Sequence, residues 1–159
     1  MAKIGLIQVD NKMDRDVFAR QQALFEMAES CLKDGADLVF FPEAFQYVFD
    51  GSIVRDSVRL LKISADWKQR CSELAKKYHA YIVPWDYEYA DTKVYNSSYI
   101  LDREGKEIGR YRKVHLTHSE QMRGLSNGED FPVFDLDIGK IGISVQDKKK
   151  GKMARVKKK

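Results

Sequence analysis

Cysteine is scarce in this sequence of 159 residues, which contains only Cys31 and Cys71. Two cysteines are too few to hold a disulfide scaffold or to build a zinc site from thiolates. No apolar run approaches the length that a helix needs to cross a bilayer, and the first residues lack the apolar stretch and cleavage site of a signal peptide. We therefore expect a cytoplasmic globular protein without a membrane span.

Motifs for two other kinds of chemistry are also missing. There is no glycine-rich loop that would cradle a phosphate and no Gly-x-Ser-x-Gly nucleophile elbow. Both cysteines lie on the apolar stripes of predicted helices, where a thiol is usually buried and inert. His115, His118 and Glu120 lie close in the sequence. Their spacing in a predicted loop, with no further strong ligand, favours hydrogen-bonded side chains over a metal site.

The net charge of +4 comes from one end of the chain. Residues 147–159 hold eight Lys or Arg and one Asp, which leaves 20 basic and 23 acidic residues over 1–146, a net charge of −3. A nucleic-acid binder usually spreads basic residues over a folded face, so we expect no nucleic-acid partner. The lysine-rich end is typical of a solvated, disordered tail. A nuclear-targeting or polyanion-binding segment, removable by deleting 147–159, is the alternative.

Hydrophobic patterning predicts an α/β fold of βαβαβ type with added hairpins. Parallel strands are expected because strand, helix and strand follow one another at the spacing of a βαβ unit. Asp14 and Gly35 are expected to cap the first helix, and Ser64 the second. Residues 54–62 are ambiguous and fit a short helix, Pro84 weakens the strand prediction over 80–86 or places a bulge there, and residues 113–130 are predicted to be a polar loop. The predicted strands are 3–9, 37–41, 80–86, 94–101, 107–112, 131–136 and 140–145, and the clearer helices are 15–34 and 65–78.

This pattern predicts a mixed sheet with helices on one face. Each helix has a single apolar stripe, so both should pack on the same side of the sheet. No segment then remains to cover the other side, although strands this apolar need cover on both faces. A missing second half or a partner is therefore expected.

Two charged residues follow predicted strands. Glu43 comes directly after DLVFFP, at the carboxyl end of a buried parallel strand, where open α/β sheets build their sites. It is expected either to act as a base or to cap a nearby helix as an ordinary loop residue. Lys113 follows EIGRYR and would stabilise a developing oxyanion. The alternative, which spacing alone favours, is that Arg110, Arg112 and Lys113 form a solvated basic edge.

Four stretches, taken in order, resemble the nitrilase superfamily of carbon–nitrogen hydrolases. The resemblance extends from residue 3 to about residue 145, and its most specific pieces are FPE (41–43) and YRKVHL (111–116). The four stretches are KIGLIQV (3–9), GADLVFFPEAF (35–45), VYNSSYILDREGKEIGRYRKVHL (94–116) and FPVFDLDIGKIGISV (131–145).

The resemblance implies an αββα sandwich, of which this chain would form an incomplete half. It also implies hydrolysis of small amides, carbamoyl compounds or nitriles by a Glu–Lys–Cys triad, without metal or cofactor, in a homo-oligomer. Carried over by motif, Glu43 is the general base and Lys113 stabilises the tetrahedral intermediate. Glu120, on a looser match within THSEQMRGLSNG, is the second glutamate that helps to position substrate. His115 also matches a motif position, where a structural role is expected.

The resemblance breaks at the nucleophile. Gln146 stands where the family has its cysteine, and a primary amide cannot replace a thiolate because its nitrogen lone pair is delocalised. We therefore expect a partial hydrolase domain over 1–146 and a lysine-rich tail over 147–159, as in a truncated or frame-shifted product. Two interpretations stay open: a carbon–nitrogen hydrolase, or a non-catalytic fragment or pseudo-enzyme that acts by binding or subunit pairing.

Overall fold

The computed structural model describes residues 1–9, 16–47 and 51–145. Within these residues no helix is long and apolar enough to cross a membrane. The helices are α1 (Val17–Lys33), α2 (Ser57–Tyr78) and α3 (His118–Arg123), with short 3₁₀ turns η1 (Phe45–Tyr47) and η2 (Ile53–Arg55). The strands are β1 (Ile4–Leu6), β2 (Leu38–Phe40), β3 (Tyr81–Val83), β4 (Trp85–Ala90), β5 (Lys93–Leu101), β6 (Glu107–Arg112), β7 (Leu125–Ser126), β8 (Val133–Leu136) and β9 (Gly139–Gly142).

Seven of the strands form one mixed sheet. β1, β2 and β3 run parallel, which confirms the predicted βαβ unit. β5 pairs antiparallel with β3 and β4 on one side and with β6 on the other, and β7 runs parallel to the start of β5. The predicted strand over 80–86 is divided between β3 and β4 at Pro84, which has no N–H to donate to the ladder.

The ends of α1 and α2 differ in part from the expected ones. Asp14 lies outside the described residues, and the N-cap of α1 is Asp16, whose carboxylate accepts hydrogen bonds from the backbone of the first turn. Gly35 follows the helix at φ 83°, as expected for a left-handed residue at that position. Ser64 is not a cap, because α2 begins at Ser57 and is capped by Asp56.

One long helix replaces the two segments expected over 54–62 and 65–78. The apolar spacing continues across both, so every turn of α2 places a buried residue toward the sheet. Residues 113–130, predicted to be a polar loop, contain α3 and β7 instead. These two short elements were missed because neither has room for a hydrophobic period.

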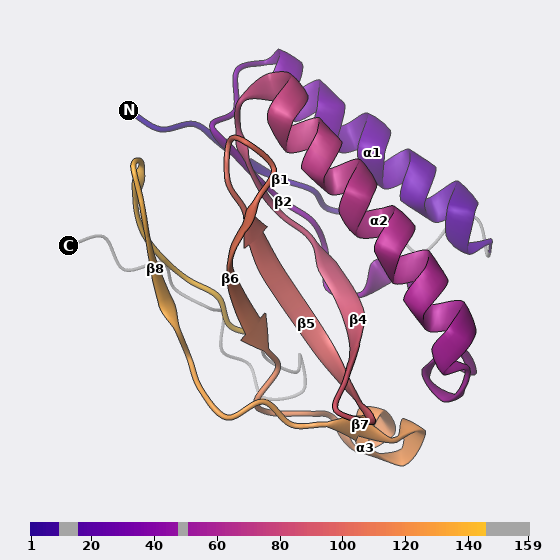
Figure 1. The fold of residues 1–159 in the computed structure, drawn as a ribbon. Coiled ribbons are helices and arrows are strands. Elements are labelled where there is room, and N and C mark those ends of the chain that lie inside the picture. Colours follow the sequence, from indigo (N-terminus) through magenta and orange to yellow (C-terminus); the bar gives the residue numbers. More distant parts are fainter. Residues whose placement is uncertain (10–15, 48–50, 146–159) are drawn as a thin grey trace.

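Both long helices pack on one face of the sheet, as predicted (Figure 1). The core between them is built around Phe25 of α1, Trp67 of α2 and Phe41, with ring centroids 4.9 to 6.1 Å apart. Val39 and Ile82, both fully buried, belong to the same cluster and come from β2 and β3. This layer is an ordinary helix-on-sheet core.

The opposite face is partly covered, which corrects the expectation that no segment of this chain would cover it. β8 and β9 form a separate two-stranded sheet, whose Phe134, Leu136 and Ile141 pack against the apolar residues of that face. In Figure 1 this hairpin stands on the side of the sheet away from α1 and α2. Cover ends before β1, where Ile4 remains 49% and Leu6 72% exposed.

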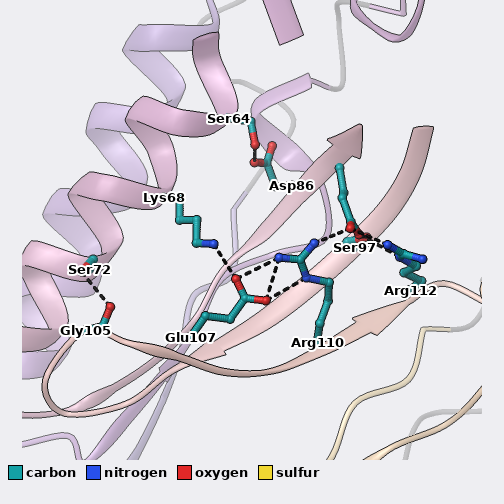
Figure 2. Close-up of polar contacts among 10 residues, drawn as sticks. Ser64, Lys68, Ser72, Asp86, Ser97, Gly105, Glu107, Arg110 and Arg112 are labelled. Carbon is teal, nitrogen blue, oxygen red and sulfur yellow. Dashed lines mark hydrogen bonds and ion pairs between the residues drawn. The ribbon is translucent and has the colours of Figure 1, made fainter. Parts of the chain in front are cut away.

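Beyond α2, on the same side of the sheet as the helices, charged side chains pair with one another. Figure 2 shows Lys68 of α2 reaching Glu107, which also binds Arg110. Arg110 and Arg112 in turn both pair with Glu88 on β4. The two arginines are therefore ion-paired and lie on the helix side of β6.

Candidate active site

Glu43, Lys113 and Glu120 meet at one point. The Nζ of Lys113 donates hydrogen bonds to Oε1 of Glu43 at 2.6 Å and to both carboxylate oxygens of Glu120 at 2.9 Å. These residues come from the loop after β2, the end of β6 and helix α3. The structure thus brings together all three described residues that the sequence singled out for catalysis.

Glu43 is placed by the end of β2. The backbone N–H of Phe41 still donates to Val83, so the chain follows the sheet to the residue before Pro42. Pro42 then ends the pairing, and Ala44 takes a positive φ of 40° that turns the chain into η1. The Glu43 side chain is 33% exposed, which leaves it partly open to solvent. It bonds Lys113 and Asn96, so the helix-capping alternative does not describe it.

Lys113 continues the pairing of β6 with β5. Its backbone N–H donates to the carbonyl of Asn96 at 2.8 Å, and its own carbonyl accepts from Gly128 at 2.9 Å. A Cβ at Gly128 would stand 2.2 Å from the carbonyl oxygen of Arg112, so only glycine permits this approach. The Lys113 side chain is 4% exposed. Strand alternation sends Arg112 to Glu88 and Lys113 to the opposite face, so the solvated basic edge does not describe Lys113.

Glu120 is positioned by a capping box. The Thr117 hydroxyl accepts from the Glu120 N–H at 3.2 Å, and Oε2 of Glu120 accepts from the Thr117 N–H at 2.8 Å. The sequence Thr-x-x-Glu is a known signature of a helix start. That signal was present in THSE (117–120), although the surrounding segment was predicted to be loop.

Asn96 is a site residue that sequence reasoning missed. Its Nδ2 donates to Oε1 of Glu43 at 2.7 Å and to Oε1 of Glu120 at 2.8 Å. The residue is 1% exposed and lies within β5. Asparagine is depleted in strands, so its place inside the strand predicted over 94–101 was the available signal.

The cluster holds one positive and two negative charges. Burial alone would lower the pKa of Lys113, but hydrogen bonds and attraction from Glu43 and Glu120 outweigh it and raise that pKa. Burial would likewise raise the pKa of Glu120, but Lys113, the Thr117 N–H and Asn96 lower it below its ordinary value. Lys113 therefore stays protonated and Glu120 ionised at neutral pH.

The remaining candidate residues lie apart from this cluster. Cys71 is fully buried in the helix–sheet core, where burial raises the pKa of its thiol, and Cys31 packs against the same core. The His115 ring lies 6.0 Å from that of Phe131. Over the described ranges, no three His, Cys, Asp or Glu side chains are grouped so as to hold a metal ion. Gln146 lies outside the described residues, immediately after Val145.

Comparison with known proteins gives the chain its relatives. A probable nitrilase of Schizosaccharomyces pombe is 30% identical over 112 residues, which are 69% of this chain and 41% of that protein. An omega-amidase of Mus musculus is 26% identical over 153 residues, which are 90% of this chain and 54% of that protein. Among solved structures, the NitN amidase from Nesterenkonia sp. AN1 shares the fold with a TM-score of 0.71 and 19% identity, over 89% of this chain and 56% of that one.

This chain spans about half the length of the curated relatives that it matches. The family model for carbon-nitrogen hydrolases matches residues 3–148, which include every residue of the charged cluster. The chain belongs to the carbon-nitrogen hydrolase family, within the nitrilase superfamily.

Proposed function

We propose that this chain carries the Glu–Lys–Glu part of a hydrolase site for small amides, with Gln146 in place of the nucleophilic cysteine. Amides are favoured over nitriles because omega-amidases and a solved amidase are among the relatives. The observation that supports it most is the convergence of Glu43 and Glu120 on the buried ammonium of Lys113.

The complete reaction needs a thiolate. The sulfur attacks the amide carbon, the C–N bond breaks, and the thioester that results is hydrolysed by water. Glu43, the partly exposed member, acts as general base: it takes the proton of the thiol, gives it to the leaving amine and then takes a proton from water. The Nesterenkonia amidase has an active-site cysteine to which acrylamide adds, consistent with this chemistry in a relative of the same fold.

Lys113 and Glu120 act through charge. Lys113 stabilises the tetrahedral intermediate because its ammonium is buried beside the base and stays protonated. Glu120 shares that ammonium and holds it in place, which leaves the site with one net negative charge when Glu43 is ionised. Such a site favours neutral amides over anionic groups at the reacting carbon.

Gln146 removes the covalent step from this chain, because an amide nitrogen is not a nucleophile. The chain as written is therefore proposed to bind amides without hydrolysing them. The second candidate, a fragment that acts by pairing with another chain, is supported by the exposed Ile4 and Leu6 on the sheet face opposite the helices.

Ammonia release from a panel of small amides, a carbamoyl compound and a nitrile tests the proposal. The chain is expected to release none, and Gln146→Cys is expected to gain release that the added substitution Glu43→Gln abolishes. Turnover by the unaltered chain that Glu43→Gln abolishes would show that another group is the nucleophile. Because Cys71 is buried in the helix core, Cys71→Ala in the Gln146→Cys background serves as a control that keeps the gained release.

A further inference from the structure

Two nitrogen donors bridge the same two carboxylate oxygens in this site. Asn96 Nδ2 and Lys113 Nζ each donate to Oε1 of Glu43, at 2.7 and 2.6 Å, and each donates to Oε1 of Glu120, at 2.8 and 2.9 Å. The four hydrogen bonds close a ring that alternates nitrogen and oxygen atoms. Both N–H groups of the Asn96 amide are consumed in it.

Asn96 is the member of this ring with the firmest support. Glu43 lies on a loop and Glu120 on a six-residue helix, whereas Asn96 lies inside β5 with β4 paired on one side. The backbone carbonyl of Asn96 also accepts a hydrogen bond from the backbone N–H of Lys113 at 2.8 Å. One residue therefore holds the lysine through its backbone and both carboxylates through its side chain.

An amide side chain suits position 96 because it is neutral. Two carboxylates share a single ammonium here, and an aspartate would add a third negative charge and supply no donor. Among the residues that the structure describes, titratable or charged groups that interact with the ring include Tyr87 on β4, Arg123 beside Tyr87, and Tyr111 on β6. Burial raises the pKa of both tyrosines, so neither is charged at neutral pH.

The orientation of the Asn96 amide leaves one of its polar atoms without a hydrogen bond. Asn96 Oδ1 is buried and has no hydrogen-bond partner among the described residues. Turning the amide over would aim that oxygen at two carboxylate oxygens, so the charges decide the orientation. Oδ1 thus stays without a partner because both N–H donors of the amide are directed at the carboxylates.

We infer that Asn96 is a positioning residue, which pins Oε1 of Glu43 and Oε1 of Glu120 to Lys113 and leaves Oε2 of Glu43 as the oxygen that exchanges protons. No described group bonds Oε2 of Glu43, whose side chain is one-third exposed. Assigning proton exchange to Glu43 rests on the proposed function, whereas the ring itself does not.

The unaltered chain tests this through the side-chain amide of Asn96, observed by ¹⁵N–¹H NMR and assigned by its loss in Asn96→Ser. Both Nδ2 protons are expected to exchange slowly with water, and to shift in Glu43→Gln and in Glu120→Gln. Ser98→Ala is the matched control, because Ser98 lies two residues along the same strand and bonds Pro84 instead of a carboxylate. Rapid exchange, with shifts indifferent to both glutamate substitutions, would overturn the inference.

A second readout follows the carboxyl of Glu120 by ¹³C NMR. Asn96→Leu is expected to raise its pKa by about one unit, because one donor to the ionised form is lost. Ser98→Ala is expected to leave that pKa unchanged. Should Asn96→Leu fail to fold, Asn96→Ser is read in the same way, and an unchanged pKa in a folded Asn96 variant contradicts the positioning role. Failure of Gln146→Cys to release ammonia from amides counts against the proposed function and leaves these signals untouched.

Discussion

Phe134 lies directly against the backbone of Gly109. A Cβ at position 109 would stand 2.1 Å from Cε1 of the ring, so only glycine lets the hairpin of β8 and β9 reach β6. The tip of the hairpin is held by Asp137, which pairs with Arg103 at 3.1 Å. These two contacts attach the second layer to the sheet just before the segment in which the nucleophile of the family is expected.

Gly109→Ala is expected to displace the hairpin. The added methyl overlaps an aromatic ring, and overpacking of this kind costs about 1–3 kcal/mol. The free energy of unfolding should fall by that amount in urea, and amide exchange should accelerate over residues 133–142. Gly142→Ala is the control, since a Cβ there meets nothing closer than 3.9 Å and the substitution should change little. Equal effects of the two substitutions would contradict the packing described.

Lys113→Met is expected to destabilise the chain by about 3 kcal/mol at neutral pH, because it leaves two carboxylates at a buried site without their positive partner. Lys113 lowers the pKa of Glu120, so this part of the stability is present above pH 4.5 and is lost as pH falls through the lower folded value. The pKa of Lys113 is itself raised, so its part is present below pH 10.5 and is lost as pH rises through the higher folded value.

The deficit in unfolding free energy of Lys113→Met, relative to the unaltered chain, should therefore be largest between about pH 5 and pH 10 and shrink in acid. Urea unfolding across this range measures it. Lys140→Met removes a lysine from an exposed pair with Asp135 and serves as the control, with a change near zero. A deficit that does not vary with pH would mean that the lost contact is apolar rather than ionic.

Asp86 provides a pH dependence of opposite sign. Burial raises its pKa to about 6, although Ser64, the Tyr47 hydroxyl at 2.7 Å and the Tyr87 N–H at 2.8 Å all donate to it. The folded state therefore binds the proton more tightly than the unfolded state, whose ordinary value is 3.8. Stability from this group is highest below pH 3.8 and falls as pH rises toward 6.

Asp86→Asn should remove that loss. The amide oxygen can accept from Tyr47 and Tyr87, and the amide nitrogen can donate to Ser64, so the hydrogen bonds survive. Relative to the unaltered chain, the variant should gain about 3 kcal/mol in unfolding free energy between pH 4 and pH 7. A difference between the two proteins that stays flat over this range would show that Asp86 titrates normally.

Much of the fold was predictable because its strands and long helices carry clear hydrophobic periods. The βαβ unit, both hairpins and the shared side of α1 and α2 followed from that pattern. Position after a strand marked Glu43 and Lys113, but left each open between two roles. Three-dimensional pairing decides that Lys113 faces away from Arg112.

Sequence reasoning missed short elements and contacts between residues far apart in the chain. α3 has six residues, too few to show a period, and its Thr117 cap was overlooked within a segment predicted to be loop. The role of Asn96 depends on Glu43, which lies 53 residues away in the chain. The hairpin of β8 and β9 was predicted as strands, but its packing across the sheet depends on Gly109.

Self-association is expected from the uncovered edge of the sheet. β1 is an edge strand, and its Ile4 and Leu6 are exposed on the face away from the helices. Sedimentation velocity should detect oligomers that Leu6→Gln reduces. Phe18→Gln, which alters an apolar side chain 55% exposed on α1, should leave them unchanged. A monodisperse monomer of the unaltered chain would exclude this surface as an interface.

The central claim is the proposal that this chain carries the Glu–Lys–Glu part of a hydrolase site with Gln146 in the place of the nucleophile, and alkylation of Gln146→Cys by acrylamide tests it most directly. If the family's site is preserved, a thiol at position 146 should react faster than Cys31 or Cys71, as followed by mass spectrometry of the labelled peptide. Adding Glu43→Gln or Lys113→Met should slow that reaction at least about tenfold, if the base and the ammonium each favour the thiolate by a little over 1 kcal/mol. A thiol at position 146 that reacts no faster than a free cysteine, and is indifferent to Glu43→Gln, would contradict the account.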